Sequence, residues 1–239
     1  MGVVGKVRYL RKGLSVKRRI YLGLIVLLVG ALSACSAAPK ESAVSQPVQP
    51  ATVVPGECQP TSAVAHNPVN VAAPSGVLNE KITSFTLVTN CGDIEIAVDQ
   101  AEAPMTITGL TTLARAGYFD ASLCHRLTTQ GLYVLQCGDP TATGSGGPAF
   151  TFPDENLPAG VENNYPAGTV AMANSGANTN GSQFFLVFAD TTLGPNYTIW
   201  GKITSGLDIV QSIADAGVQG GGADGTPVKT IAIEKVIVK

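Results

Sequence analysis

The chain has 239 residues, of which 15 are basic and 17 acidic, and its formal net charge is only −2. That value hides an asymmetry, because seven basic residues lie within residues 1–19 and all 17 acidic residues follow Cys35. Beyond Cys35, eight basic residues face 17 acidic ones, a net charge of −9. Such an acidic surface argues against binding to nucleic acid or to anionic lipid.

The first 34 residues have the pattern of a secretory signal. A basic stretch is followed by an uncharged apolar run over 20–32, which is shorter than the about 20 residues that span a bilayer. The junction Leu32-Ser33-Ala34-Cys35 resembles the bacterial lipoprotein signal, in which the cysteine is lipidated and becomes the new N-terminus. We therefore expect a lipid on Cys35 and an extracytoplasmic location in the bacterial cell envelope. The alternative is an ordinary signal with an incidental cysteine.

Residues 35–80 have the composition of a linker. Seven of the 15 prolines fall between Pro39 and Pro74, among small and polar residues. This composition favours extended or disordered chain, so the folded domain is expected over residues 81–239.

The domain sequence predicts short strands with two helices. Alternating apolar residues predict a hairpin over 83–98, and Pro104 begins a helix that Gly117 ends. A second helix is expected over 207–216, followed by a loop over 217–225. Further strands are expected over 123–127, 133–137, 169–173, 183–188, 198–203 and 230–238. About eight strands and two helices indicate a mainly β fold, a closed eight-stranded antiparallel barrel capped by two helices.

The run from Met172 to Phe185 is rich in amides, hydroxyls and glycine, yet it leads directly into the apolar strand over 183–188. Amides beside an aromatic patch suit the recognition of a peptide backbone next to an apolar side chain. The function is therefore expected to lie here.

Several motifs in order resemble those of cyclophilin-type peptidyl-prolyl cis-trans isomerases. They are Cys124-His125-Arg126, the run Tyr133–Asp139, Gly144-Ser145-Gly146-Gly147 and the run Met172–Phe185. The resemblance covers nearly all of residues 82–239. The family fold, an eight-stranded barrel with a helix at each end, agrees with the strands and helices expected above.

The resemblance implies a role for each matching residue. Arg126 would be the catalytic group, stabilising the twisted X-Pro amide without covalent chemistry. The other expected substrate-binding residues are Tyr133, Val134, Gln136, Gly144, Ala173, Asn174, Gln183, Phe185, Leu193 and Tyr197. Of the neighbouring aromatic residues, Phe184, Phe188 and Trp200 are expected in the core.

Other chemistries fit less well. Isomerisation transfers no net proton, so His125 is expected to be a packed, hydrogen-bonded residue rather than a general base. Ser182 lacks the surroundings of a nucleophile, which argues against hydrolysis. No cofactor or metal is expected. A zinc site from Cys124, His125 and Cys137 is disfavoured because adjacent strand residues point to opposite faces.

Four cysteines remain after Cys35, and in an oxidising compartment they permit three pairings. Cys124 and Cys137 lie opposite each other near the ends of a predicted hairpin, so we expect a disulfide between them. Cys58 would then pair with Cys91 and hold the distal half of the linker to the domain.

Two functions remain open. The first is a surface-tethered, monomeric prolyl isomerase that acts on proline-containing segments of exported proteins, with the lipid on Cys35 in the membrane and no nucleic-acid partner. The second is a module that binds such segments, with turnover incidental.

Overall fold

The structure, a computed structural model, describes residues 57–239. The predicted signal peptide over 1–34, Cys35 and the first part of the predicted linker lie outside the described residues. Within the described part of the chain, no helix is long and apolar enough to cross a membrane.

Residues 57–239 form ten strands and two α-helices. The helices are α1 (Pro104–Arg115) and α2 (Leu207–Ala216), and a short 3-10 turn covers Gln219–Gly221. The strands are β1 (Ser84–Thr89), β2 (Gly92–Val98), β3 (Ser122–Leu123), β4 (Arg126–Gln130), β5 (Leu132–Cys137), β6 (Thr169–Met172), β7 (Phe184–Val187), β8 (Ile199–Ser205), β9 (Asp224–Gly225) and β10 (Ala232–Val238). Both helices and the longer strands confirm the expectation of a mainly β domain with two helices.

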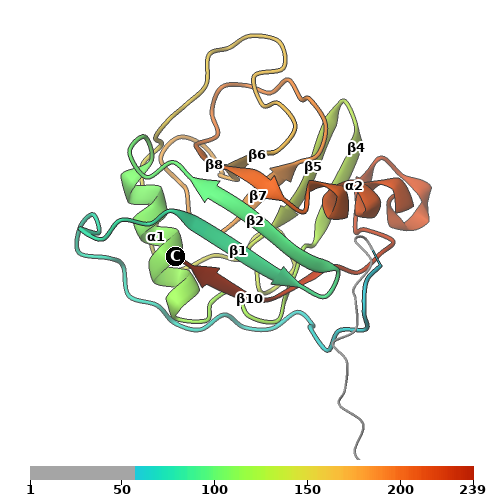
Figure 1. Cartoon of the computed structure of the whole chain (residues 1–239), viewed down its shortest axis with the longest axis horizontal. Coiled ribbons are helices and arrows are strands. Elements are labelled where there is room, and N and C mark those ends of the chain that lie inside the picture. The colour runs from blue at the N-terminus through green and yellow to red at the C-terminus, as the bar shows by residue number, and fades with distance from the viewer. Residues whose placement is uncertain (1–56) are drawn as a thin grey trace, which may run out of the picture. The chain divides into compact units, whose positions relative to one another are not determined.

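The strands form one antiparallel sheet in the order β3-β10-β1-β2-β8-β6-β7-β5-β4-β9. The sheet curls into a half-barrel, and α1 and α2 lie at opposite sides of it (Figure 1). The long connection between β5 and β6, residues 138–168, supplies loops that border the site described below.

The expectation of a closed eight-stranded barrel was wrong. The run predicted as one strand over 123–127 breaks at Cys124–His125, so that β3 pairs with β10 whereas β4 pairs with β5 and β9. Within the described residues the sheet therefore ends at β3 and β9, two strands of two residues each. β9 lies in the segment 217–225 that the sequence predicted to be a loop.

Helix α1 begins with an unusual cap. Pro104 occupies the first turn, where its missing N–H costs no hydrogen bond. The methyl side chain of Ala103 cannot cap the helix, and Glu155 takes that role by accepting hydrogen bonds from the backbone N–H groups of Met105 (2.9 Å) and Thr106 (2.8 Å). A carboxylate at this end of a helix is also favourable to the helix dipole. One acidic residue thus ties the connection between β5 and β6 to α1.

The main core fills the inside of the curled sheet. Trp200 is 1% exposed and packs edge-on against Phe85 and Phe184, with ring centroids 5.6 and 5.7 Å apart. Gly201 permits β8 to approach β2 closely, since a Cβ atom there would lie 2.7 Å from the Ala97 carbonyl oxygen. Trp200 and Phe184 therefore belong to the core, as expected, and Phe188 packs against it while partly exposed.

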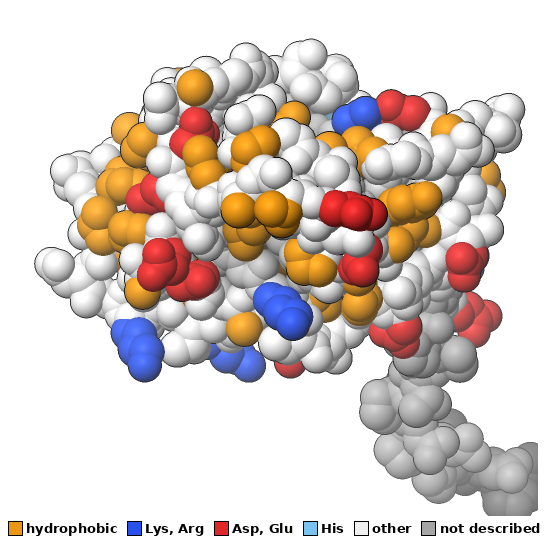
Figure 2. Space-filling model, turned by 90° about the horizontal axis from the view of Figure 1, so that it is seen from above, with side chains coloured by type: hydrophobic (Ala, Val, Ile, Leu, Met, Phe, Trp, Pro, Cys, Tyr) orange, Lys and Arg blue, Asp and Glu red, His pale blue; other side chains and the backbone are white. Residues whose placement is uncertain are grey.

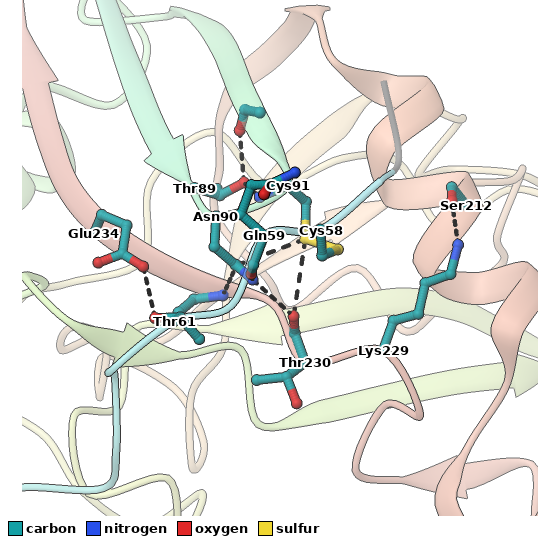
Figure 3. The surroundings of a disulfide bond; sticks show 12 residues. Cys58, Gln59, Thr61, Thr89, Asn90, Cys91, Ser212, Lys229, Thr230 and Glu234 are labelled. Carbon is teal, nitrogen blue, oxygen red and sulfur yellow. Dashed lines mark hydrogen bonds between the residues drawn. A yellow bond between two sulfur atoms is a disulfide. The ribbon is translucent and has the colours of Figure 1, made fainter. Parts of the chain in front are cut away.

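Residues 57–82 run along the domain, and we call them the strap. A disulfide joins Cys58 to Cys91 at the turn between β1 and β2 (Figure 3). Beside it, the N–H of Gln59 donates to the carbonyl of Asn90 (2.7 Å), and the Asn90 side chain donates back to the Gln59 carbonyl (2.9 Å). Thr61 donates to Glu234 of β10 (2.6 Å). This part of the predicted linker is thus attached to the sheet.

A second disulfide joins Cys124 to Cys137, 13 residues apart. Both expected cysteine pairs are therefore present in the structure. Seen from above, one face of the molecule carries interspersed apolar and acidic side chains and few basic ones (Figure 2). That distribution agrees with the acidic balance of the sequence.

Candidate functional site

The site is built on a row of residues that crosses four strands on the outer face of the sheet. Arg126 of β4 pairs with Gln136 of β5, which pairs with Phe185 of β7, which pairs with Ala171 of β6. Directly paired residues project to the same face of a sheet. The register therefore places a cation, an amide and an aromatic ring side by side.

A pocket with an apolar floor lies over this row. Its floor is Phe185, whose ring packs against Tyr197 (centroids 5.6 Å apart) and Tyr165 (6.2 Å). Tyr165 is completely buried, and its hydroxyl accepts a hydrogen bond from the Tyr197 N–H (3.1 Å). This pocket, which we call the groove, is lined by Arg126, Leu132, Val134, Gln136, Ala173, Asn174, Phe185, Leu193 and Tyr197.

The guanidinium of Arg126 lies at the edge of the groove with three of its N–H groups engaged. Nε and Nη2 donate to the two carboxylate oxygens of Asp224 (2.8 and 2.7 Å), and Nη1 donates to Oε1 of Gln136 (3.2 Å). The hydrogen bonds and charge of Asp224 raise the pKa of Arg126, and Arg126 in turn lowers the pKa of Asp224. The arginine is therefore a permanent cation with a fixed orientation.

The two glutamines continue this chain of hydrogen bonds. Gln136 Nε2 donates to Oε1 of Gln183 (2.7 Å), and Gln183 Nε2 donates to the carbonyl of Gly146 (2.8 Å). Each amide is thus oriented by its neighbour, with the oxygen of Gln136 toward the arginine. The line from Arg126 to Gly146 forms a polar edge along the groove.

A second pocket adjoins the groove and shares Gln136, Ala173 and Asn174 with it. Its outer wall is the segment Gly144–Gly147, which is held by the buried carboxylate of Asp139. That carboxylate accepts hydrogen bonds from the N–H groups of Thr141 (2.8 Å), Gly144 (2.8 Å) and Gly146 (3.0 Å). Burial raises the pKa of Asp139, but these hydrogen bonds, with that of the Thr141 hydroxyl, outweigh burial and lower it overall.

The amide side chain of Asn174 is already occupied. Its Nδ2 donates to the Asn196 carbonyl (2.8 Å), and its Oδ1 accepts from the Gly176 N–H (3.2 Å). The side chain therefore shapes the wall between the two pockets.

An apolar pocket bordered by a fixed cation and oriented amides suits a peptide that contains proline. The family model of the cyclophilin type peptidyl-prolyl cis-trans isomerase/CLD matches residues 84–238. The chain belongs to this family. The enzyme class expected from the motifs is confirmed.

Curated relatives and a solved structure agree with this assignment. The chain is 40% identical over 206 residues to the "Probable peptidyl-prolyl cis-trans isomerase B" of Mycobacterium tuberculosis, covering 80% of this chain and 67% of that protein. The protein of the same name from Mycobacterium leprae is 41% identical over 202 residues, covering 79% and 68%. A cyclophilin type isomerase of Cryptosporidium parvum matches with a TM-score of 0.57 at 25% identity, covering 66% of this chain and 98% of that one.

The cyclophilin site contains most of the residues expected from the sequence. Arg126 and seven others line the groove, namely Val134, Gln136, Ala173, Asn174, Phe185, Leu193 and Tyr197. Gly144 and Gln183 line the adjoining pocket. Tyr133 lies elsewhere, with its ring 5.9 Å from that of Phe188, because it alternates with Val134 along β5 and points to the other face.

His125 differs in one respect from the expectation. Its ring lies next to Gly144, but neither ring nitrogen has a hydrogen-bond partner among the described residues. Burial lowers the pKa of this imidazole below the ordinary value of 6.5, which Asp139 partly opposes. The ring is therefore neutral near pH 7, and it serves as a packed side chain.

Sequence reasoning missed three residues of the cyclophilin site. Leu132 lines the groove, and its alternation with Val134 in β5 was the available signal. Tyr165 lies outside the strands and helices and Asp224 lies in the two-residue strand β9, so no periodicity indicates which way either side chain points. No group of three or more His, Cys, Asp or Glu residues within 57–239 is arranged to hold a metal ion.

Proposed function

We propose that the groove binds the proline of an X-Pro segment and that Arg126 lowers the barrier to rotation about its peptide bond. The observation that carries this proposal is the row Arg126–Gln136–Phe185, which puts a fixed cation beside an aromatic floor. A related structure, of the Cryptosporidium parvum isomerase, was obtained in the presence of the dipeptide Ala-Pro.

The reaction makes and breaks no covalent bond and only rotates the X-Pro peptide bond. Amide resonance makes the barrier about 20 kcal/mol, and uncatalysed X-Pro rotation takes tens to hundreds of seconds. As the bond twists, resonance is lost and the lone pair returns to the prolyl nitrogen. A hydrogen bond from an N–H group to that nitrogen is stronger in the twisted state than in either planar state. The donor therefore stabilises the transition state and lowers the barrier to rotation. Arg126 has N–H groups free for this contact on Nη1 and Nη2.

The remaining groups hold the peptide on either side of the rotating bond. Phe185, Val134 and Leu193 fix the proline ring, so that only the preceding residue turns. Gln136 and the backbone at Asn174 bind the peptide main chain, and the adjoining pocket receives a residue before the proline. Positioning of this kind contributes without any proton transfer.

The test compares Arg126→Ala with Arg115→Ala in the full-length protein. Arg115 is the other arginine of the domain and forms an exposed bidentate pair with Glu80, so it controls for loss of a charge and an ion pair. Exchange of a proline peptide measured by NMR should slow by about 100-fold or more for Arg126→Ala, which loses the donor. Equal rates for the two variants would refute the proposal.

A binding module is the second function, favoured by the well-formed apolar pocket itself. Phe185→Ala removes the pocket floor, whereas Arg126→Ala leaves it in place. If a cell-envelope phenotype follows loss of Phe185 but not loss of Arg126, binding rather than catalysis is the physiological role.

We further propose that the protein is a monomer exported to the bacterial cell envelope, with a signal peptide over 1–34, a lipid on Cys35 and a tether from there to the isomerase domain. The junction Leu32–Cys35 supports this location, as do the two disulfides, which form and persist in oxidising compartments. Its substrates are then proline-containing segments of exported proteins. Mass spectrometry of the N-terminus in wild type and Cys35→Ala tests the lipid, and an unmodified Cys35 would rule it out.

A further inference from the structure

The contact between Asp224 and Arg126 lies outside the groove, yet it governs the catalytic side chain. The carboxylate covers the Nε and Nη2 edge of the guanidinium with two short hydrogen bonds (2.8 and 2.7 Å). Asp224 is absent from the residues that line the groove. Its contact with the arginine is on the Nε and Nη2 side of the guanidinium.

Backbone pairing holds Asp224 in this place. In β9, Asp224 pairs with Thr128 and Gly225 pairs with Leu127, and the N–H of Thr129 donates to the Ala223 carbonyl (2.9 Å). Because Asp224 lies opposite Thr128, its side chain shares a face with Arg126 two residues along β4, the diagonal position at which long side chains meet. The pairing of β9 with β4 thus places the Asp224 carboxylate next to Arg126.

The ion pair is poorly placed to stabilise the fold. The two side chains are 40% and 54% exposed, and exposed pairs contribute little to stability because water and salt screen them. Its effect is on orientation. An arginine side chain has four flexible torsions, and a bidentate carboxylate restricts the plane and the direction of the guanidinium.

Two N–H groups of the Arg126 guanidinium remain available to a substrate. Of the five guanidinium N–H groups, Asp224 takes two and Gln136 takes one. The two that remain belong to Nη1 and Nη2, at the end of the side chain. Gln136 is itself held by Gln183, so the arginine is fixed from both sides.

We propose that Asp224 is a positioning residue for isomerisation, which acts by fixing the Arg126 guanidinium with its free N–H groups toward the prolyl nitrogen. This inference rests on the proposed function, in which Arg126 is the catalytic group. It adds a residue of β9, in a segment that the sequence presents only as a glycine-rich loop.

The experiment measures kcat and KM of the full-length protein on a proline peptide for Asp224→Ala, Asp224→Asn and Asp224→Glu. Glu80→Gln is the matched control, because Glu80 forms a bidentate pair with Arg115 of closely similar exposure away from the groove. Asp224→Ala should lower kcat about 10- to 100-fold with KM little changed, since the pocket survives and only the donor is misaligned. Asp224→Glu should restore part of the rate.

A double-mutant cycle separates positioning from general damage. In an Arg126→Ala background, Asp224→Ala should have no further effect on kcat, since there is nothing left to orient. A wild-type kcat for Asp224→Ala, a loss no larger than that of Glu80→Gln, or a gain in activity would overturn the inference while leaving the proposed function intact. If Arg126→Ala itself retains full activity, the proposed function fails first.

Discussion

Phe184 and Phe185 are neighbours in the chain, yet they pack into separate apolar clusters on opposite faces of β7. Phe184 is 2% exposed and contacts Trp200 in the main core, whereas Phe185, at 5% exposed, contacts Tyr165 and Tyr197 beneath the groove. Successive side chains of a strand alternate between faces, so this four-residue strand supplies one ring to the main core and the other to the floor of the groove.

Replacement of each phenylalanine by leucine should separate the two roles. Phe184→Leu should lower the free energy of unfolding by about 1 to 2 kcal/mol through imperfect packing, and leave kcat/KM unchanged below the unfolding transition. Phe185→Leu should raise KM several-fold because it changes the floor of the groove. Urea unfolding and NMR exchange of a proline peptide provide the two measurements. Identical profiles for both variants would contradict the division of the two faces.

Asp139 should support the adjoining pocket through the loop that it holds. Asp139→Asn places an amide N–H₂ group among backbone donors, which leaves hydrogen bonds unmade in a buried site and should cost on the order of 2 to 3 kcal/mol. KM should rise most for peptides with a long side chain before the proline. The exposed Asp93→Asn is a control. Unchanged stability of Asp139→Asn would show that the loop does not depend on this carboxylate.

The pH dependence of stability should include a contribution from His125. Burial lowers the pKa of the folded imidazole below 6.5, so below about pH 6.5 the unfolded chain binds a proton that the folded protein does not. Stability should therefore fall as the pH is lowered from 6.5, by at most about 1.4 kcal/mol per pH unit from this residue. His125→Gln should flatten this part of the curve. Urea unfolding between pH 5 and 7.5 tests it, and an NMR titration midpoint of His125 at or above 6.5 would exclude it.

The two disulfides should differ in their effect on catalysis. They close chain segments of 33 and 13 residues, so their loss should cost about 4 and about 3 kcal/mol respectively in the chain-entropy account. Replacing Cys58 and Cys91 by serine should leave kcat/KM unchanged, because that pair lies at the turn between β1 and β2. Replacing Cys124 and Cys137 should lower it, because they flank the paired residues Arg126 and Gln136. Unfolding curves and peptide exchange distinguish these outcomes.

The regular part of the fold was predictable from residue patterns. Alternation placed most strands within one or two residues, and the helix over 207–216 matches α2. The open form of the sheet was not predictable, because a continuous run over 123–127 does not indicate the break at Cys124–His125. That break depends on two partners far apart in sequence, β10 and β5.

In the site too, some residues could be predicted from the sequence and others depended on strand pairing. Residues on strands or in recognisable motifs, such as Gln136 and Phe185, were found by pattern and resemblance. Tyr133 was misplaced relative to the groove because resemblance gave its position but not its face. Asp224 was missed because only the pairing of β9 with β4 brings it to Arg126, and two residues in a glycine-rich segment carry no readable strand pattern.

The bond between Cys58 and Cys91 also determines the path of mechanical tension through the molecule. With the bond intact, a pull on the N-terminal side of Cys58 passes directly to the turn between β1 and β2, and the strap carries no load. With the bond reduced, the same pull acts on the hydrogen bonds of the strap, one after another. Peeling residues 59–82 from the sheet would release chain that spans about 80 Å when extended. Reduction of this one disulfide would therefore lengthen the chain available on the N-terminal side of the domain.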